Sequence, residues 1–151
     1  MSLAKKFYSD PMAAQNGTWV DYPDARNEDQ SVPGFLLARM SRQNKDYTRE
    51  SRELLKGYDK EEDGTPIIPT GDEDANVALL DKLVAIFCRT VLRGWRNFKD
   101  IEGNDIPYSP ENAYALFKTD GPWEALYSDL KAKAEAASTF AVKRQAALEK
   151  N

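Results

Sequence analysis

The chain has 151 residues, of which 41% are hydrophobic and 30% are charged, and this length and composition favour one folded domain over a disordered chain. Its formal net charge of −4 argues against a nucleic-acid-binding protein, because such proteins usually carry a basic excess that meets the phosphates. The absence of histidine removes Ser/His and Cys/His nucleophile arrangements and histidine-ligated zinc sites.

A β-hairpin is predicted near the N-terminus. Residues 1–17 are polar and are expected to form a loose arm. Residues 18–22 carry strand-favouring side chains and stop before a proline, and residues 35–40 can pair with them as a second strand. Because an isolated two-stranded hairpin is only marginally stable, this one must pack against helices.

A charged helix and a linker follow the hairpin. The helix is expected over residues 41–58, with Asn44 as its N-cap, so residues 18–58 are predicted to form a subdomain of a hairpin plus a helix. Residues 57–71 contain two prolines and three glycines, which mark the clearest break in the chain. We place the linker itself at residues 59–71.

The remaining residues, 72–151, are predicted to form a helical subdomain. Its strongest helix begins at the acidic run from Asp72 and then repeats apolar residues at spacings of three and four, which is typical of a buried helix face. A short helix begins at Ser109, which is its expected N-cap, and a last helix begins at Gly121-Pro122. Its alanine-rich end, residues 131–148, has high helix propensity and little to bury, so we expect it to supply a docking or self-association surface.

These elements together predict a mainly α fold, a small helical domain with a short N-terminal β-hairpin. The longest apolar run, residues 83–88, is far shorter than the about 20 residues that a membrane-spanning helix needs, and no apolar signal segment follows the N-terminus. Cys88 is the only cysteine, which excludes an internal disulfide and fits a reducing compartment. We therefore expect a soluble protein that has no membrane partner and whose cysteine lies in the core.

The sequence offers no catalytic, cofactor or metal site. Acidic residues cluster around the linker, which is expected to be exposed to solvent. Acid–base catalysis requires two carboxyl groups whose environments give them different pKa values, and a solvated loop does not provide this. Asp59 to Gly64 resembles the start of a calcium loop, but Thr70 stands where the bidentate glutamate is needed, so a flexible acidic linker is the better interpretation. We predict that the protein is not an enzyme.

A row of basic residues recurs every three or four positions before and within the first long helix. Its members are Arg39, Arg42, Lys45, Arg49, Arg52 and Lys56. Such a row suits nucleic acid or an acidic partner. Because Asp46, Glu50 and Glu53 are interleaved with it, we interpret the row as a solvated face of mixed charge.

Aromatic residues flank the turns between the later helices. Most are expected in the core, and one or two at its rim are expected to anchor a partner. With two apolar residues near the C-terminus, the predicted partner-binding residues are Trp95, Phe98, Tyr108, Trp123, Phe140 and Leu148.

Three motifs in order carry a family resemblance. These are the Leu-x-x-Trp run at residues 92–95, the Glu-Gly turn at residues 102–103, and the Pro-Tyr-Ser-Pro-Glu-Asn helix start at residues 107–112. Over roughly residues 35–130 the chain resembles the tail assembly chaperones of long-tailed (siphovirus-type) bacteriophages. The resemblance implies that the protein binds the tape-measure protein and tail-tube subunits in the host cell cytoplasm, and that it is absent from the mature virion.

The resemblance also implies a longer product made by ribosomal frameshifting. Lys150 and Asn151 can be encoded as AAA AAC, so we expect a slippery run there, which the nucleotide sequence of the locus tests. Two alternatives stay open. One is a structural phage protein, such as a head–tail connector or tail-completion factor, which would be found in purified particles. The other is a generic helical protein-interaction module.

Overall fold

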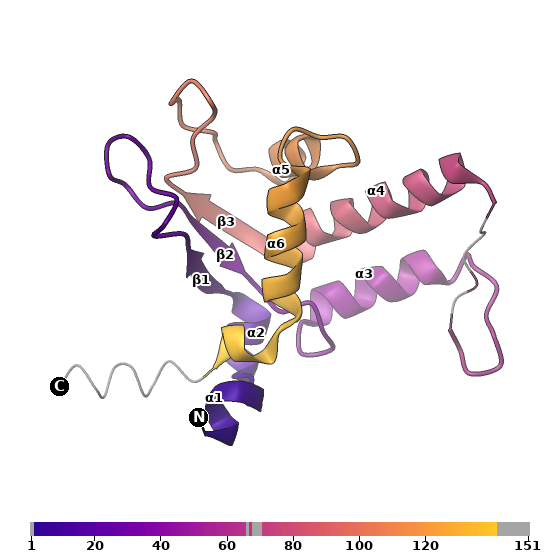
Figure 1. The fold of residues 1–151 in the computed structure, drawn as a ribbon. Helices are drawn as coiled ribbons and strands as arrows, with labels where there is room; N and C mark the ends of the chain where they lie inside the picture. Colours follow the sequence, from indigo (N-terminus) through magenta and orange to yellow (C-terminus); the bar gives the residue numbers. More distant parts are fainter. Residues whose placement is uncertain (1, 66, 68–70, 142–151) are drawn as a thin grey trace.

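The fold is a three-stranded antiparallel sheet packed with α-helices (Figure 1). The computed structural model describes residues 2–65, 67 and 71–141. The strands are β1 (Thr18–Asp21), β2 (Gly34–Leu37) and β3 (Leu92–Arg96), in the order β1-β2-β3. The expected mainly α fold with only a short hairpin is therefore wrong, because β3 makes the hairpin a sheet and the fold a mixed α/β one.

The pairing of β1 with β2 confirms the predicted hairpin contact. Val20 lies opposite Phe35 in this pair, and on the other side of β2 Phe35 lies opposite Trp95 of β3. Leu36 pairs with Gly94 and Leu37 with Leu92, so Arg93 is an extra residue that forms a bulge in β3, and Leu37 is fully buried beside it. The β2–β3 pairing therefore joins the predicted N-terminal subdomain to the predicted helical one in a single sheet, while the domain boundaries themselves stay a prediction.

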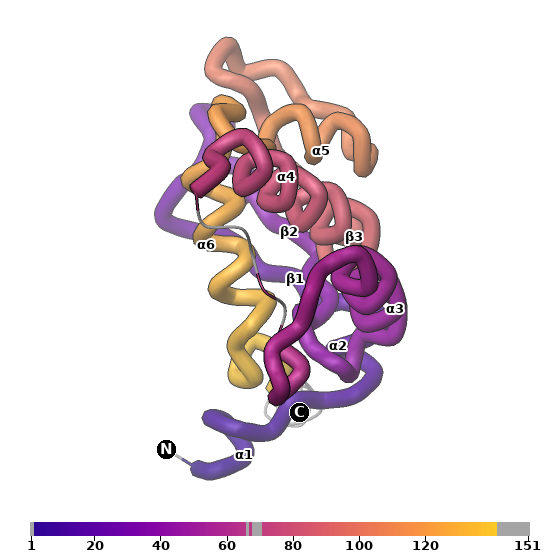
Figure 2. Tube along the Cα trace, turned by 90° about the vertical axis from the view of Figure 1, so that its right-hand side faces the viewer, coloured from indigo at the N-terminus to yellow at the C-terminus, as the bar shows by residue number. Residues whose placement is uncertain are grey.

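The helices lie around this sheet and at the two ends of the chain (Figures 1 and 2). Their bounds are α1 (Leu3–Phe7), α2 (Pro11–Asn16), α3 (Lys45–Leu55), α4 (Glu73–Thr90), α5 (Pro110–Phe117) and α6 (Glu124–Glu135), with a 3-10 turn, η1 (Ala137–Phe140). The predicted N-caps are confirmed, since the Asn44 side chain accepts a hydrogen bond from Tyr47 and that of Ser109 accepts one from Asn112.

Two terminal segments differ from the sequence-based expectation. Residues 1–17 were expected to form a loose arm, but they include α1 and α2, and Ala14 is fully buried. The last helix was expected to continue through residues 131–148, but α6 ends at Glu135 and η1 follows, while residues 142–148 lie outside the described part of the chain. Phe140 is fully buried and its carbonyl accepts a hydrogen bond from the Asp10 amide at 2.7 Å, so tertiary contacts outweigh the helix propensity of the alanines.

The core lies between the sheet and helices α4, α5 and α6. Phe87, Val91 and Leu92 are fully buried at the junction of α4 and β3. The apolar spacing of α4 predicts this burial for Phe87, which lies within the helix. By contrast α3 has no buried residue and packs chiefly along α4. The two helices lie side by side and extend away from the sheet (Figure 1), so much of their surface faces solvent.

Candidate partner-binding groove

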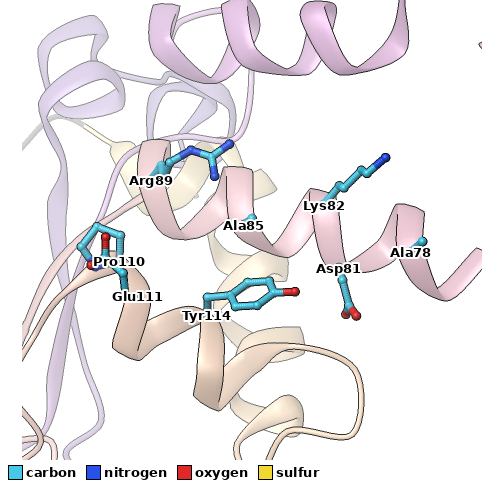
Figure 3. Close-up of a pocket in the computed structure, with 8 residues that line it drawn as sticks. All are labelled: Ala78, Asp81, Lys82, Ala85, Arg89, Pro110, Glu111 and Tyr114. Atoms are coloured by element: carbon cyan, nitrogen blue, oxygen red, sulfur yellow. The ribbon is translucent and has the colours of Figure 1, made fainter. Parts of the chain in front are cut away.

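An open groove runs between α4 and α5, with a cavity volume of about 580 Å³. Its lining side chains are those of Ala78, Asp81, Lys82, Ala85, Arg89, Pro110, Glu111 and Tyr114 (Figure 3). The alanines give it a low apolar floor, and the Tyr114 ring and Pro110 form the wall on the α5 side. Grooves of this form, with an apolar floor and polar edges, accept a helix from a partner.

The groove follows from residue spacing in α4. Ala78, Lys82, Ala85 and Arg89 are separated by four, three and four positions, so they share one face of the helix. Val84 and its neighbours on the opposite side fill the core. Because alanine is small, the face between the longer side chains stays hollow and open.

Charged side chains of both signs surround the apolar floor. The Asp81 carboxylate accepts a hydrogen bond from the Thr119 amide at 2.9 Å, which ties the start of the α5–α6 connection to α4. Arg89 donates two hydrogen bonds to Glu50 of α3, at 2.7 and 2.9 Å. In the described part of the chain, no oppositely charged group lies within 4.0 Å of Lys82 or Glu111. Both side chains can therefore orient a polar partner.

A second hollow, of about 350 Å³, adjoins the first on the other side of α4. Lys82, Ala85 and Arg89 line both hollows, while Leu54 and Glu50 of α3 line only the second. The outer face of α4 is therefore flanked by α5 on one side and α3 on the other. A segment lying along α4 would contact all three helices.

Four of the predicted partner-binding residues lie together around one aromatic cluster. The Trp95 ring contacts those of Phe98 and Tyr108 edge-to-face at 5.1 and 5.0 Å between centroids, and Phe98 contacts Trp123 at 5.0 Å. The Trp95 indole donates a hydrogen bond to the Ile106 carbonyl at 2.7 Å. The Tyr108 hydroxyl donates one to the Leu92 carbonyl at 2.8 Å. These contacts hold β3 against the segment that precedes α5.

The other two predicted residues lie apart from this cluster. Phe140 is fully buried in η1, and Leu148 lies outside the described residues. None of the five described residues lines the α4–α5 groove, and a role for all six in partner binding stays a prediction. The groove residues were missed because alanines within a helix give no signal of their own in a single sequence.

Cys88 lies in the core, as predicted, with only 1% of its surface exposed. Burial raises the pKa of its thiol from 9.0 to about 12, because the charged thiolate would lose its hydration. Burial likewise raises the pKa of Tyr127 to about 12. Both groups thus resist ionisation in the folded state.

The free energy of unfolding is expected to fall as the pH rises from about 9 toward 12. Below pH 9 the thiol is protonated in both states, whereas above it the unfolded chain loses the proton first, which favours unfolding. Urea unfolding at a series of pH values measures the slope. Cys88→Ala should have a shallower slope, with Tyr127 still contributing, and a slope equal to that of the wild type would contradict this assignment.

In residues 2–65, 67 and 71–141, no three His, Cys, Asp or Glu side chains gather closely enough to hold a metal ion. Within the same ranges, no helix combines the length and apolar character needed to cross a bilayer.

Comparison with known proteins identifies the chain as a phage-derived protein. It belongs to the YdaY prophage protein family, whose sequence model matches residues 42–151. The match covers α3 to α6, and thus both helices of the groove. No curated protein and no solved structure matches the chain.

Proposed function

We propose that this prophage protein is a non-enzymatic tail assembly chaperone, which binds the tape-measure protein and tail-tube subunits in the host cytoplasm during tail morphogenesis. Its phage origin and the three ordered motifs between Leu92 and Asn112 support this proposal. The observation that carries it is the open α4–α5 groove, whose alanine floor and charged edges suit a helical segment of a partner.

The physical argument rests on what the groove offers to a helix. Ala78 and Ala85 allow close approach of another backbone, and burying their apolar surroundings would supply the favourable free energy. Lys82 and Glu111 at opposite edges would fix the direction of the bound helix through their opposite charges. Nothing in this arrangement requires a covalent step.

Co-purification of the full chain with the product of the neighbouring tape-measure gene tests the proposal. The double variant Ala78→Arg/Ala85→Arg fills the groove and is expected to weaken binding by about tenfold or more, as loss of a central anchor site does. Ala125→Arg/Ala132→Arg is the matched control, because it places two arginines at the same spacing on exposed positions of α6.

Circular dichroism should give the same helix content for both variants and the wild type. Binding by the groove variant equal to that of the control would overturn the role of the groove. Failure of the wild type to bind the tape-measure protein, together with its presence in purified phage particles, would replace the chaperone by a structural phage protein.

A further inference from the structure

A separate surface lies on the outer side of α3. Five exposed basic side chains recur there at spacings of three and four, one in the turn before α3, three within the helix and one at its C-cap. This surface, here named the α3 basic stripe, consists of Arg42, Lys45, Arg49, Arg52 and Lys56. Arg39, which belongs to the same row in the sequence, is half-buried and donates a hydrogen bond to Gln43 instead.

The acidic residues interleaved with the stripe neutralise it only in part. The Glu50 carboxylate turns toward α4 and pairs with Arg89 at 2.7 Å. Asp46 is shared between Arg93 of β3 at 3.1 Å and Arg49 at 3.3 Å. Arg93 is the first cause of the lowered pKa of the Asp46 carboxyl, so this acid remains charged and committed to β3.

Three cations of the stripe are left without an acidic partner. Among the described residues, Arg42, Lys45 and Arg52 have no carboxylate within 4.0 Å, whereas Arg49 shares Asp46 with Arg93 and Lys56 pairs with Glu53 at 3.1 Å. The five side chains border a shallow hollow of about 380 Å³, in which Thr48 lies between them. A chain of net charge −4 thus keeps a row of cations on one solvent-facing helix side.

We propose that the α3 basic stripe binds an acidic helical segment of a partner protein, one that repeats carboxylates every three or four residues. A second helix has the same rise of about 1.5 Å per residue, so its carboxylates would meet Lys45, Arg49 and Arg52 of α3 in register. Each exposed ion pair contributes little, so binding needs several pairs together and weakens with salt. This proposal does not rest on the chaperone function, because no residue of the stripe lines the α4–α5 groove.

The surroundings favour a protein over nucleic acid as the occupant. Asp46 and Glu53 lie beside the cations and would repel a continuous phosphate backbone. No aromatic side chain borders the hollow within the described residues, so bases would find no stacking platform there.

Fluorescence anisotropy with the full chain tests the proposal. The probe is a labelled alanine-based helical peptide of about 18 residues, with glutamate at every third and fourth position, and a peptide with glutamine at those positions is its control. We expect the wild type to bind the glutamate peptide at low salt and not the glutamine peptide. Arg42→Glu/Lys45→Glu/Arg52→Glu should weaken binding by about tenfold or more.

The matched control variant is Lys5→Glu/Lys6→Glu/Lys118→Glu, which changes the net charge equally at exposed positions outside α3. It should keep most of the binding, and both variants should have the helix content of the wild type. An equal loss in the two variants would overturn the proposal in favour of net charge alone. Tighter binding to DNA of equal charge would overturn it in favour of a nucleic-acid surface, and absence of binding to the glutamate peptide would also overturn it.

Discussion

Phe35→Ala is expected to lower the free energy of unfolding by about 3–5 kcal/mol, the range for removing a buried phenylalanine. Phe35 is 1% exposed and lies in β2, the central strand of the sheet. Its ring contacts those of Tyr22, Trp95 and Phe98 edge-to-face, with centroids 5.9, 6.3 and 5.2 Å away. The substitution would therefore leave a cavity where all three strands and the aromatic cluster meet.

Urea denaturation measured by far-ultraviolet circular dichroism gives the size of the effect. Phe7→Ala is the matched control, since it makes the same chemical change at a side chain that is 63% exposed in α1. The control is expected to lie within about 0.5 kcal/mol of the wild type. Similar losses in the two variants would mean that Phe35 does not occupy the centre of the core.

Asn44→Ala is expected to cost about 2–4 kcal/mol, because one side chain makes two separate contacts. Its oxygen caps α3 by accepting a hydrogen bond from the Tyr47 amide at 3.3 Å. Its nitrogen donates to the Thr90 carbonyl at 2.8 Å, at the end of α4. Asn44 is fully buried, so alanine would leave that carbonyl without a hydrogen-bond donor and without water.

Ser109→Ala separates the two contributions, because the Ser109 side chain caps α5 and bonds to no other element in the described structure. Its loss is expected to cost about 1 kcal/mol, the usual value for an N-cap. Chemical denaturation of both variants under the same conditions gives the difference. If Asn44→Ala costs no more than Ser109→Ala, the bond that connects α3 to α4 contributes nothing to stability.

The helices were predicted well from the sequence, because N-caps and apolar spacing are signals between residues close together in the chain. Asn44 and Ser109 act as caps where their positions predict them. The apolar spacing of α4 correctly places Val84 and Phe87 in the core, but Leu80 of the same predicted face is 54% exposed. Local signals could not reveal β3. Leu92 follows the end of α4 directly, and the strand exists because it pairs with β2, a contact between distant parts of the chain.

The candidate groove was beyond prediction for a different reason. Ala78 and Ala85 have high helix propensity and occur on exposed helix faces of many proteins, so their presence does not point to a site. Only the position of α5 makes them the floor of a groove, and that position depends on the packing of α4 against α5. The aromatic residues, by contrast, are conspicuous in the sequence, and four of them prove to gather in one cluster.

The order of the strands also determines how long β2 lacks one of its neighbours while the chain is synthesised. Phe35 pairs with Trp95, which the ribosome adds 60 positions later. At a translation rate of about 5–20 residues per second, β3 is synthesised roughly 3–12 s after β2. The hydrogen bond of the Asp10 amide forms later still, because its acceptor is the carbonyl of Phe140. A nascent chain therefore exposes one side of β2 for seconds, and the segment between its first two helices acquires its contact with η1 only after Phe140 has been added.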